Sequence, residues 1–192
     1  MIRNLEDLMF QVSDLFLAPV LVLLIALFLY SLYALGAFAA QAWRRRRHSY
    51  DYHQALATGL QGQPPLDGYP LASLVQAKPT ITQDELDVAA LEEVEGVRMV
   101  SRLAPMLGLV ATMAPMGPAL KSLADGDIQG ISDNLIVAFS AVIFGLVIAS
   151  ITFWIASIKK RWLAKELVSL APHLEQATMP TSTPEEMSRA AA

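Results

Sequence analysis

The segment best equipped for chemistry inside a membrane is the apolar run Leu103–Leu120, which contains one hydroxyl group and the prolines Pro105, Pro115 and Pro118. A proline inside a helix removes the hydrogen bond to the carbonyl group four residues earlier. Pro115 therefore frees the carbonyl of Ala111, next to the hydroxyl of Thr112. A donor beside free acceptors at membrane depth can hold a chain of waters or relay a proton. In the alternative interpretation, the kinked helix serves only for packing, and the Thr112 hydroxyl donates a hydrogen bond to a carbonyl of its own helix.

Only a few other polar groups accompany Thr112 in the apolar runs. Ser140 suits pore lining and helix packing equally well, and Asn134 lies near one end of its run. Small residues at helical spacing allow helix backbones to approach closely in lipid. We assign kinks and packing to Pro105, Gly108, Pro115, Gly117, Pro118, Ala141 and Gly145, and we assign an ion pathway or a partner-facing surface to Thr112, Ser140, Ala111 and Asn134.

The sequence carries no recognisable catalytic or metal-binding constellation. It contains no cysteine, which excludes disulfides and thiolate sites. It has no glycine-rich phosphate loop, and its three histidines form no metal-binding motif. The net charge of −4 gives no reason to expect a nucleic-acid partner. We therefore expect neither an enzyme nor a bound metal or cofactor.

The chain is markedly more apolar than a soluble domain. Of its 192 residues 54% are hydrophobic and 17% are charged, against about 45–50% and about 25% in typical soluble domains. Three uncharged runs hold the excess: 15–43, 103–120 and 134–158. A helix needs about 20 apolar residues to cross a bilayer. We predict an all-α integral membrane protein with three transmembrane helices and cytoplasmic helical extensions.

The distribution of basic residues predicts the orientation. Lys and Arg near the ends of spans favour the cytoplasmic side. Four arginines, Arg44 to Arg47, follow the first span, and a basic cluster beginning at Lys159 follows the third. We therefore expect an outer N-terminus, a cytoplasmic 44–102 loop and a cytoplasmic C-terminus.

The remaining segments complete the predicted organisation. A stripe of apolar residues predicts a short amphipathic helix over 1–14, lying on the outer face. Within the 44–102 loop, residues 48–80 are rich in Pro and Gly and should be irregular or only briefly helical. The box formed by Thr82 and Glu85 predicts a helix from about residue 83 into the second span. We expect an outer turn over 121–133, a cytoplasmic helix over 159–177 that stops near Pro172, and a disordered tail over 178–192.

Three helices cannot enclose a pore and still bury all their small faces. Symmetric assembly of identical subunits solves this problem, with the second and third spans facing the axis and the first facing lipid. The acidic residues Glu92, Glu93 and Glu95 would then gather at the inner mouth of the ring and raise the local cation concentration. A solvated helix face explains them equally well.

The pattern of the second and third spans resembles that of the MotA/TolQ/ExbB proton-channel family. The segment Ala104–Thr112 is similar to the family's A-P-x-x-G-L-x-G-T sequence. Residues 115–120, 126–128, 138–140 and 145–146 continue the resemblance. The chain departs from the family pattern at three positions: Val137 and Val142 stand where members carry polar residues, and Ala111 stands where they carry glycine.

The resemblance implies a pentameric ring around a dimer of a single-span partner of the ExbD, TolR or MotB type. The titratable aspartate of the family lies on that partner, and Thr112 corresponds to the polar threonine that faces it. The resemblance further implies the ring-forming subunit of an ion-driven motor complex in the inner membrane of a prokaryotic cell, with protons as the expected ion, which converts ion-motive force into mechanical work or transport. The alternative is a non-conducting oligomeric scaffold for a neighbouring complex.

Overall fold

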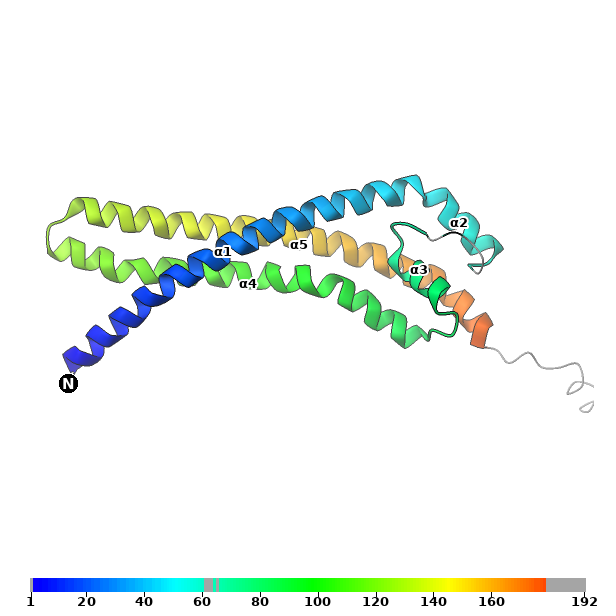
Figure 1. The fold of residues 1–192 in the computed structure, drawn as a ribbon, viewed down its shortest axis with the longest axis horizontal. Helices are drawn as coiled ribbons and strands as arrows, with labels where there is room; N and C mark the ends of the chain where they lie inside the picture. The colour runs from blue at the N-terminus through cyan, green and yellow to red at the C-terminus, as the bar shows by residue number, and fades with distance from the viewer. Residues whose placement is uncertain (1, 61–63, 65, 179–192) are drawn as a thin grey trace, which may run out of the picture. The chain divides into compact units, whose positions relative to one another are not determined.

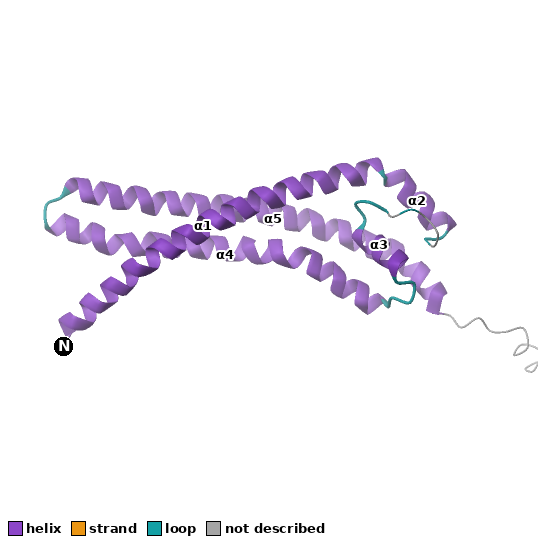
Figure 2. Ribbon diagram, in the orientation of Figure 1, coloured by secondary structure: helices purple, strands orange, loops and turns teal. Residues whose placement is uncertain are grey.

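The computed structural model describes residues 2–60, 64 and 66–178, and its side chains between residues 15 and 174. All regular structure in these residues is helical (Figures 1 and 2). The helices are α1 (Ile2–Arg47), α2 (Ser49–Thr58), α3 (Pro70–Ala77), α4 (Gln83–Ala124) and α5 (Ile128–Thr178). Three of them are long and apolar enough to cross a membrane. The chain is thus an all-helical protein with three candidate spans, as predicted.

The chain divides into two compact units. The first, here called the span unit, contains residues up to Ala39 and Val94–Ile158. The second, here called the loop unit, contains Ala40–Glu93 and the residues from Lys159 onward. Each of the long helices α1, α4 and α5 contributes residues to both units.

In the span unit, α4 and α5 lie side by side as an antiparallel hairpin (Figure 1). Every third or fourth residue of α5 is buried: Ala138, Ala141, Gly145, Ile148, Thr152 and Ile155. The facing residues of α4 are equally small, and Ala104 and Ala111 are fully buried. Small side chains on both helices bring the two backbones close together, which is the main source of helix association in lipid.

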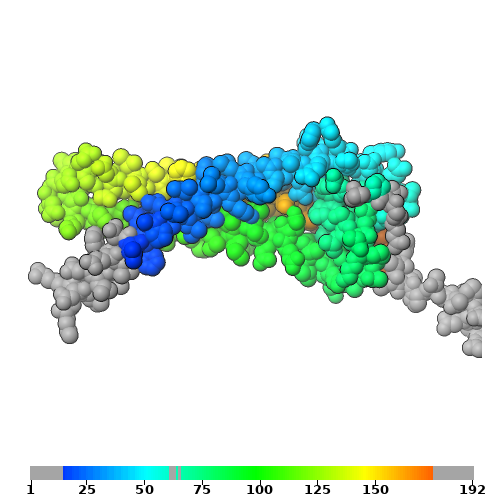
Figure 3. Space-filling model, viewed as in Figure 1, coloured from blue at the N-terminus to red at the C-terminus, as the bar shows by residue number. Residues whose placement is uncertain are grey.

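The first span packs against this hairpin along one narrow stripe. Leu24 joins the buried cluster of Ala104, Ala111, Ala141 and Ile148. Two aromatic pairs extend the contact, with ring centroids 5.2 Å apart for Phe28 and Phe144 and 5.6 Å apart for Phe38 and Trp154. Only 11% of the most apolar window of this span is buried, and its residues lie at the surface in Figure 3. The rest of the helix is free to face lipid.

The N-terminal region differs from the prediction of a separate helix over 1–14. Helix α1 runs from Ile2 to Arg47 without a break. Its first 17 residues contain neither Gly nor Pro, so no helix-ending signal separates them from the span. Pro19 is accommodated inside the helix. The position of residues 1–14 on the outer face stays a prediction.

The connection between α4 and α5 is shorter than the predicted turn over 121–133. Only residues 125–127 are non-helical. Gly126 adopts the left-handed conformation, with φ of 73°, which ends α4 without steric cost. The Asp127 carboxylate accepts a hydrogen bond of 3.0 Å from the N–H of Gly130 and so caps α5. These two adjacent signals let the chain reverse within three residues.

The start of α4 carries the capping box that the sequence predicted. The N–H of Glu85 donates to the hydroxyl of Thr82 and the N–H of Thr82 to the Glu85 carboxylate, so the capping box starts α4. Residues 48–80 contain the short helices α2 and α3. The predicted stop near Pro172 is wrong, because α5 continues to Thr178. Pro172 frees the carbonyl of Val168, and Val168 is exposed, so solvent can satisfy that carbonyl. Apart from Thr178, the tail predicted over 178–192 lies outside the described residues.

We predict that Gly145→Ala destabilises the hairpin. A Cβ atom at position 145 would lie 2.8 Å from the backbone oxygen of Ala104 and 3.2 Å from the Cα of Gly108, so α4 and α5 would have to separate. Overpacking of this kind costs about 1–3 kcal/mol. The thermal unfolding midpoint in detergent should fall. Gly36→Ala is the matched control, because a Cβ there meets nothing within 4 Å. Equal midpoints for the two variants would show that the close contact does not exist.

Candidate functional site

The candidate ion pathway lies on the α4–α5 hairpin of the span unit. Thr112 is half-buried, and its hydroxyl donates a hydrogen bond of 2.6 Å to the carbonyl of Leu109. The hydroxyl proton is therefore held by the helix itself, as in the alternative sequence interpretation. The oxygen of Thr112 keeps its lone pairs, so the side chain can still accept a hydrogen bond from another group.

Ser140 differs from the other hydroxyls of the spans. It is exposed, and no residue in the described part of the chain accepts or donates a hydrogen bond to it. In contrast, each of the following hydroxyls donates to a carbonyl of its own helix: Ser31, Thr112, Ser150, Thr152 and Ser157. Ser140 is thus, among the described serine and threonine residues of the spans, the one whose hydroxyl is free to act as a donor.

The other residues assigned to the pathway have structural roles within one chain. Ala111 is fully buried beside Ala104 and Ala141, so it is a packing residue and does not line an open surface. Its assignment to the pathway rested on its place next to Thr112 and stays a prediction. Asn134 is half-buried, and its amide donates 2.8 Å to the carbonyl of Gly130. No contact joins Thr112 and Ser140 within the described chain.

Of the residues assigned to kinks and packing, Gly108, Ala141 and Gly145 lie in contact. Gly108 lies against Ala141, Val142 and Gly145, with a virtual Cβ 3.5 Å from each backbone. Pro115 is almost completely buried, while Pro105, Gly117 and Pro118 are half-buried. All three prolines lie inside a continuous α4.

The acidic residues assigned to an inner mouth lie in different surroundings. Glu93 forms an ion pair of 2.7 Å with Lys159 in the loop unit. Glu92 and Glu93 line a pocket of about 280 Å³ together with Pro70, Leu71 and Leu74 of α3 and Ala89 of α4. Glu95 is exposed. No group of three or more potential ligands in the described chain could hold a metal ion.

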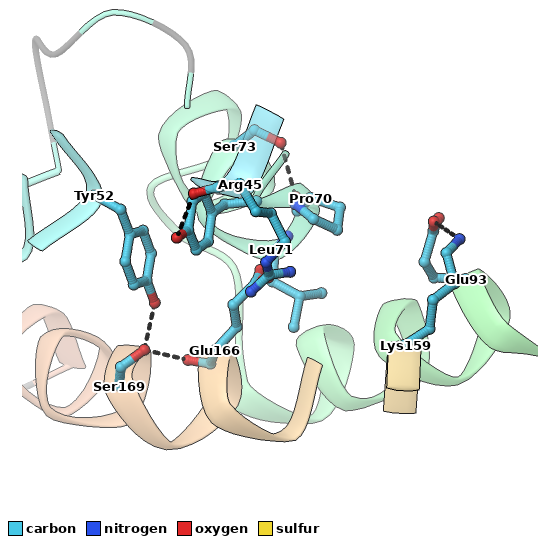
Figure 4. A network of polar contacts seen from close by, with 10 residues as sticks. Arg45, Tyr52, Pro70, Leu71, Ser73, Glu93, Lys159, Glu166 and Ser169 are labelled. Carbon is cyan, nitrogen blue, oxygen red and sulfur yellow. Dashed lines mark hydrogen bonds and ion pairs between the residues drawn. The ribbon is translucent and has the colours of Figure 1, made fainter. Parts of the chain in front are cut away.

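A buried ion pair in the loop unit was not predicted from the sequence. Arg45 Nη1 and Glu166 Oε1 lie 2.5 Å apart, and their side chains are 12% and 1% exposed (Figure 4). The N–H of Leu71 donates 3.2 Å to the other carboxylate oxygen, and Ala72 donates as well. Glu166 therefore holds the end of α1 and the start of α3 at the same point.

Aromatic rings enclose the guanidinium group of this pair. The Cζ atom of Arg45 lies 4.3 Å from the ring centroid of Tyr69 and 4.9 Å from that of Trp162. The ring of Tyr52 stacks on Tyr69 at 3.9 Å, and its hydroxyl bonds Ser169 (Figure 4). A cation over aromatic faces is stabilised by the ring quadrupoles. The aromatic side chains thus replace water around the buried charge.

The local sequence explains how this cluster forms. Gly68 has φ of 94°, and a Cβ atom there would lie 3.0 Å from the backbone nitrogen of Arg45, so only glycine allows this approach. Glu166 lies between the buried Leu163 and Leu170 at helical spacing. An acidic residue on an apolar stripe is the signal that could have revealed a buried charge.

Burial raises the pKa of the Glu166 carboxyl above its ordinary value of 4.5. Arg45 and the two backbone N–H groups act in the opposite direction, but the loss of solvation is larger. Burial also raises the pKa of Tyr52 and of Tyr69. Burial of the Glu166 carboxylate therefore costs free energy, and Arg45 and the two backbone N–H groups offset part of this cost.

We predict that Arg45→Met destabilises the loop unit strongly, because it leaves Glu166 buried without its countercharge. Removing one partner of a buried pair costs about 3–5 kcal/mol, whereas replacing both by apolar residues is often neutral. The double variant Arg45→Met/Glu166→Leu should therefore unfold at a higher temperature than Arg45→Met. Thermal unfolding in detergent measures both. If the double variant were less stable than Arg45→Met, the unpaired charge of Glu166 would not be the cause of the destabilisation.

We also predict a pH dependence that Glu166→Gln removes. Because the pKa of Glu166 is raised on folding, the folded protein binds this proton more tightly than the unfolded chain does. The resulting stability is present below about pH 4.5 and is lost as the pH rises through the higher folded-state pKa. The unfolding midpoint of the wild type, relative to Glu166→Gln, should fall from pH 4 to pH 8. A constant difference, or one that grows with pH, would contradict the raised pKa.

Comparison with known protein families identifies one match. Residues 72–171, which include most of α3 and the whole of the second and third spans, match the MotA/TolQ/ExbB proton channel family. Searches of curated proteins and of solved structures gave no match. The family match covers more than half of the 192 residues and contains the Thr112 segment and the Gly108–Gly145 contact. The chain belongs to the MotA/TolQ/ExbB proton channel family.

Proposed function

We propose that this chain is the ring-forming subunit of an ion-driven motor complex in the inner membrane of a prokaryotic cell. Family membership makes it a multi-pass channel or motor subunit rather than an enzyme. In the proposed complex, several copies, five by analogy with the family, surround a dimer of a single-span partner. Ion flow between ring and partner drives their relative movement and so supplies mechanical work or transport.

The observation that carries the proposal is the absence of ionisable side chains from the spans of a proton-channel family member. No Asp, Glu, Lys, Arg or His occurs in 15–43, 103–120 or 134–158. Proton transfer through a membrane requires titratable groups or ordered waters. We infer that the titratable carboxylate comes from another chain, a single-span partner bearing an aspartate, as in the family.

We infer that the hydroxyls of Thr112 and Ser140 play different hydrogen-bonding roles. Thr112 donates to Leu109, so its oxygen can accept a hydrogen bond from the partner's protonated carboxylic acid. Ser140 is exposed and can donate a hydrogen bond to the carboxylate form or to a water. Ser140 would thereby supply the polar group that Val142 lacks, although on a different side of α5.

The proposed orientation follows from the charge distribution. Twelve of the 14 basic residues lie on one side if the N-terminus is outside and the loop unit is cytoplasmic. Ions would then move between the short turn at Gly126 and the loop unit. Glu92, Glu93 and Glu95 would lie at the inner end, where acidic side chains raise the local cation concentration.

We predict that Thr112→Val reduces proton flux in proteoliposomes that contain the ring and its partner. The substitution keeps the shape of the side chain and removes the acceptor for the carboxylic acid. A hydrogen bond between two neutral groups contributes about 0.5–1.5 kcal/mol, so flux should fall about two- to tenfold. Thr112→Ser should retain most of the flux. Ser150→Ala is the control, because this exposed hydroxyl bonds only its own helix at Leu146.

The same experiment separates the motor subunit from the scaffold alternative. A scaffold without conduction tolerates Thr112→Val but loses its assembly when Gly145→Leu forces the hairpin apart. Flux that is unchanged in Thr112→Val would remove Thr112 from the pathway. Absence of flux in the wild type with its partner would favour the scaffold.

A further inference from the structure

Two exposed stripes of opposite charge lie on neighbouring helices of the loop unit. The acidic stripe of α4 consists of Asp84, Asp87, Val88 and Leu91. The basic stripe of α5 consists of Arg161, Ala164, Lys165 and Val168. Within each stripe the residues are three or four apart and so share one face of a helix.

Neither stripe forms an ion pair with another part of the described chain. The buried face of α4 carries Leu86 and Ala90, and the buried face of α5 carries Leu163 and Leu170. The side of α4 toward α3 is formed by Ala89, Glu92 and Glu93. Within the described chain, the charged residues of the two stripes have no ion-pair partner, whereas the neighbouring Glu93 is paired with Lys159.

Each stripe also exposes apolar side chains that water does not favour. Val88 and Leu91 are 54% and 64% exposed, and Val168 is 77% exposed. An exposed apolar centre bordered by charge is typical of a surface that contacts another protein. The acidic border of one stripe matches the basic border of the other, so a second copy of this chain carries the complementary surface.

The ion pair between Glu93 and Lys159 shows which residues of α4 and α5 lie at the same height along the helix axes. These side chains meet at 2.7 Å, so their residues lie at about the same height. Asp87 precedes Glu93 by six residues, and Lys165 follows Lys159 by six residues. The helices α4 and α5 run in opposite directions and rise about 1.5 Å per residue. Asp87 and Lys165 therefore both lie about 9 Å from the level of the Glu93–Lys159 contact, on the same side of it. By the same reasoning, Leu91 is level with Arg161.

Rotation about an axis parallel to the helices does not change these levels. In a ring, α4 of one copy therefore meets α5 of the next copy in the same register. We propose that the acidic stripe of each copy binds the basic stripe of its neighbour, with Asp87 opposite Lys165, Val88 opposite Ala164 and Leu91 opposite Arg161. This interface rests on the ring of the proposed function and assigns a contact within it.

Site-directed cross-linking tests the register directly. The chain contains no cysteine, so introduced thiols have no background. Copies carrying Asp87→Cys are co-expressed with copies carrying Lys165→Cys and treated with a short bis-maleimide reagent. We expect a cross-linked dimer only when both variants are present. Asp67→Cys, at an exposed position of the same unit, replaces Asp87→Cys in the control.

Two cross-linking results would overturn the proposal. A dimer formed by Asp87→Cys copies alone would show that like stripes meet about a twofold axis. Rings that assemble and conduct without any Asp87–Lys165 cross-link would reject the interface and leave the proposed function intact. A wild-type protein that is monomeric in detergent and in membranes would reject both.

Charge reversal provides an independent measurement. Asp87→Lys and Lys165→Asp should each weaken assembly, by up to about fivefold in the association constant for each contact. The combination Asp87→Lys/Lys165→Asp should restore it, because opposite charges again face each other. The mass of the particle in detergent, followed as the protein is diluted, reports the change. Asp67→Lys controls for net charge, and single reversals that behave like this control would contradict the proposal.

Discussion

The backbone contact between α4 and α5 at Gly145 is the constraint on which the span unit depends. A Cβ atom there would lie 2.8 Å from a backbone oxygen of α4, so no side chain larger than hydrogen fits without movement. In lipid, helices gain little from burying apolar surface, and close packing must hold them together. The small residues that allow this packing leave the polar Thr112 and Ser140 beside the interface rather than within it.

The spans and the loop unit differ in where they hold charged side chains. The spans hold no Asp, Glu, Lys, Arg or His, which fits the proposed channel subunit whose titratable carboxylate lies on a partner. The loop unit, by contrast, buries Arg45 and Glu166 almost completely. This burial is tolerable because the carboxylate accepts backbone N–H groups of α3 and the guanidinium lies over two aromatic rings. A buried ion pair of this kind favours one arrangement of the helix ends over others.

Exposed apolar side chains in the span unit and exposed charged stripes in the loop unit support assembly of several copies. In the span unit, large apolar side chains such as Phe139 and Ile143 of α5 remain exposed, as lipid or a neighbouring subunit requires. In the loop unit, the acidic and basic stripes are complementary and lie at matching levels. Both observations support a molecule that is completed by further copies of itself and by a partner bearing the carboxylate.

Hydropathy and local signals in the sequence determined the three long helices, the capped start of α4 and the family, since these depend on residues close together in the chain. The sequence alone also singled out Thr112, Ser140 and the glycine contact. Only the tertiary structure decided that Ala111 is buried, that Thr112 bonds Leu109, and that Arg45 meets Glu166. Those facts depend on how residues on different helices, or a side chain and its own helix, are oriented. Local propensity does not fix such orientations, because they are set by packing.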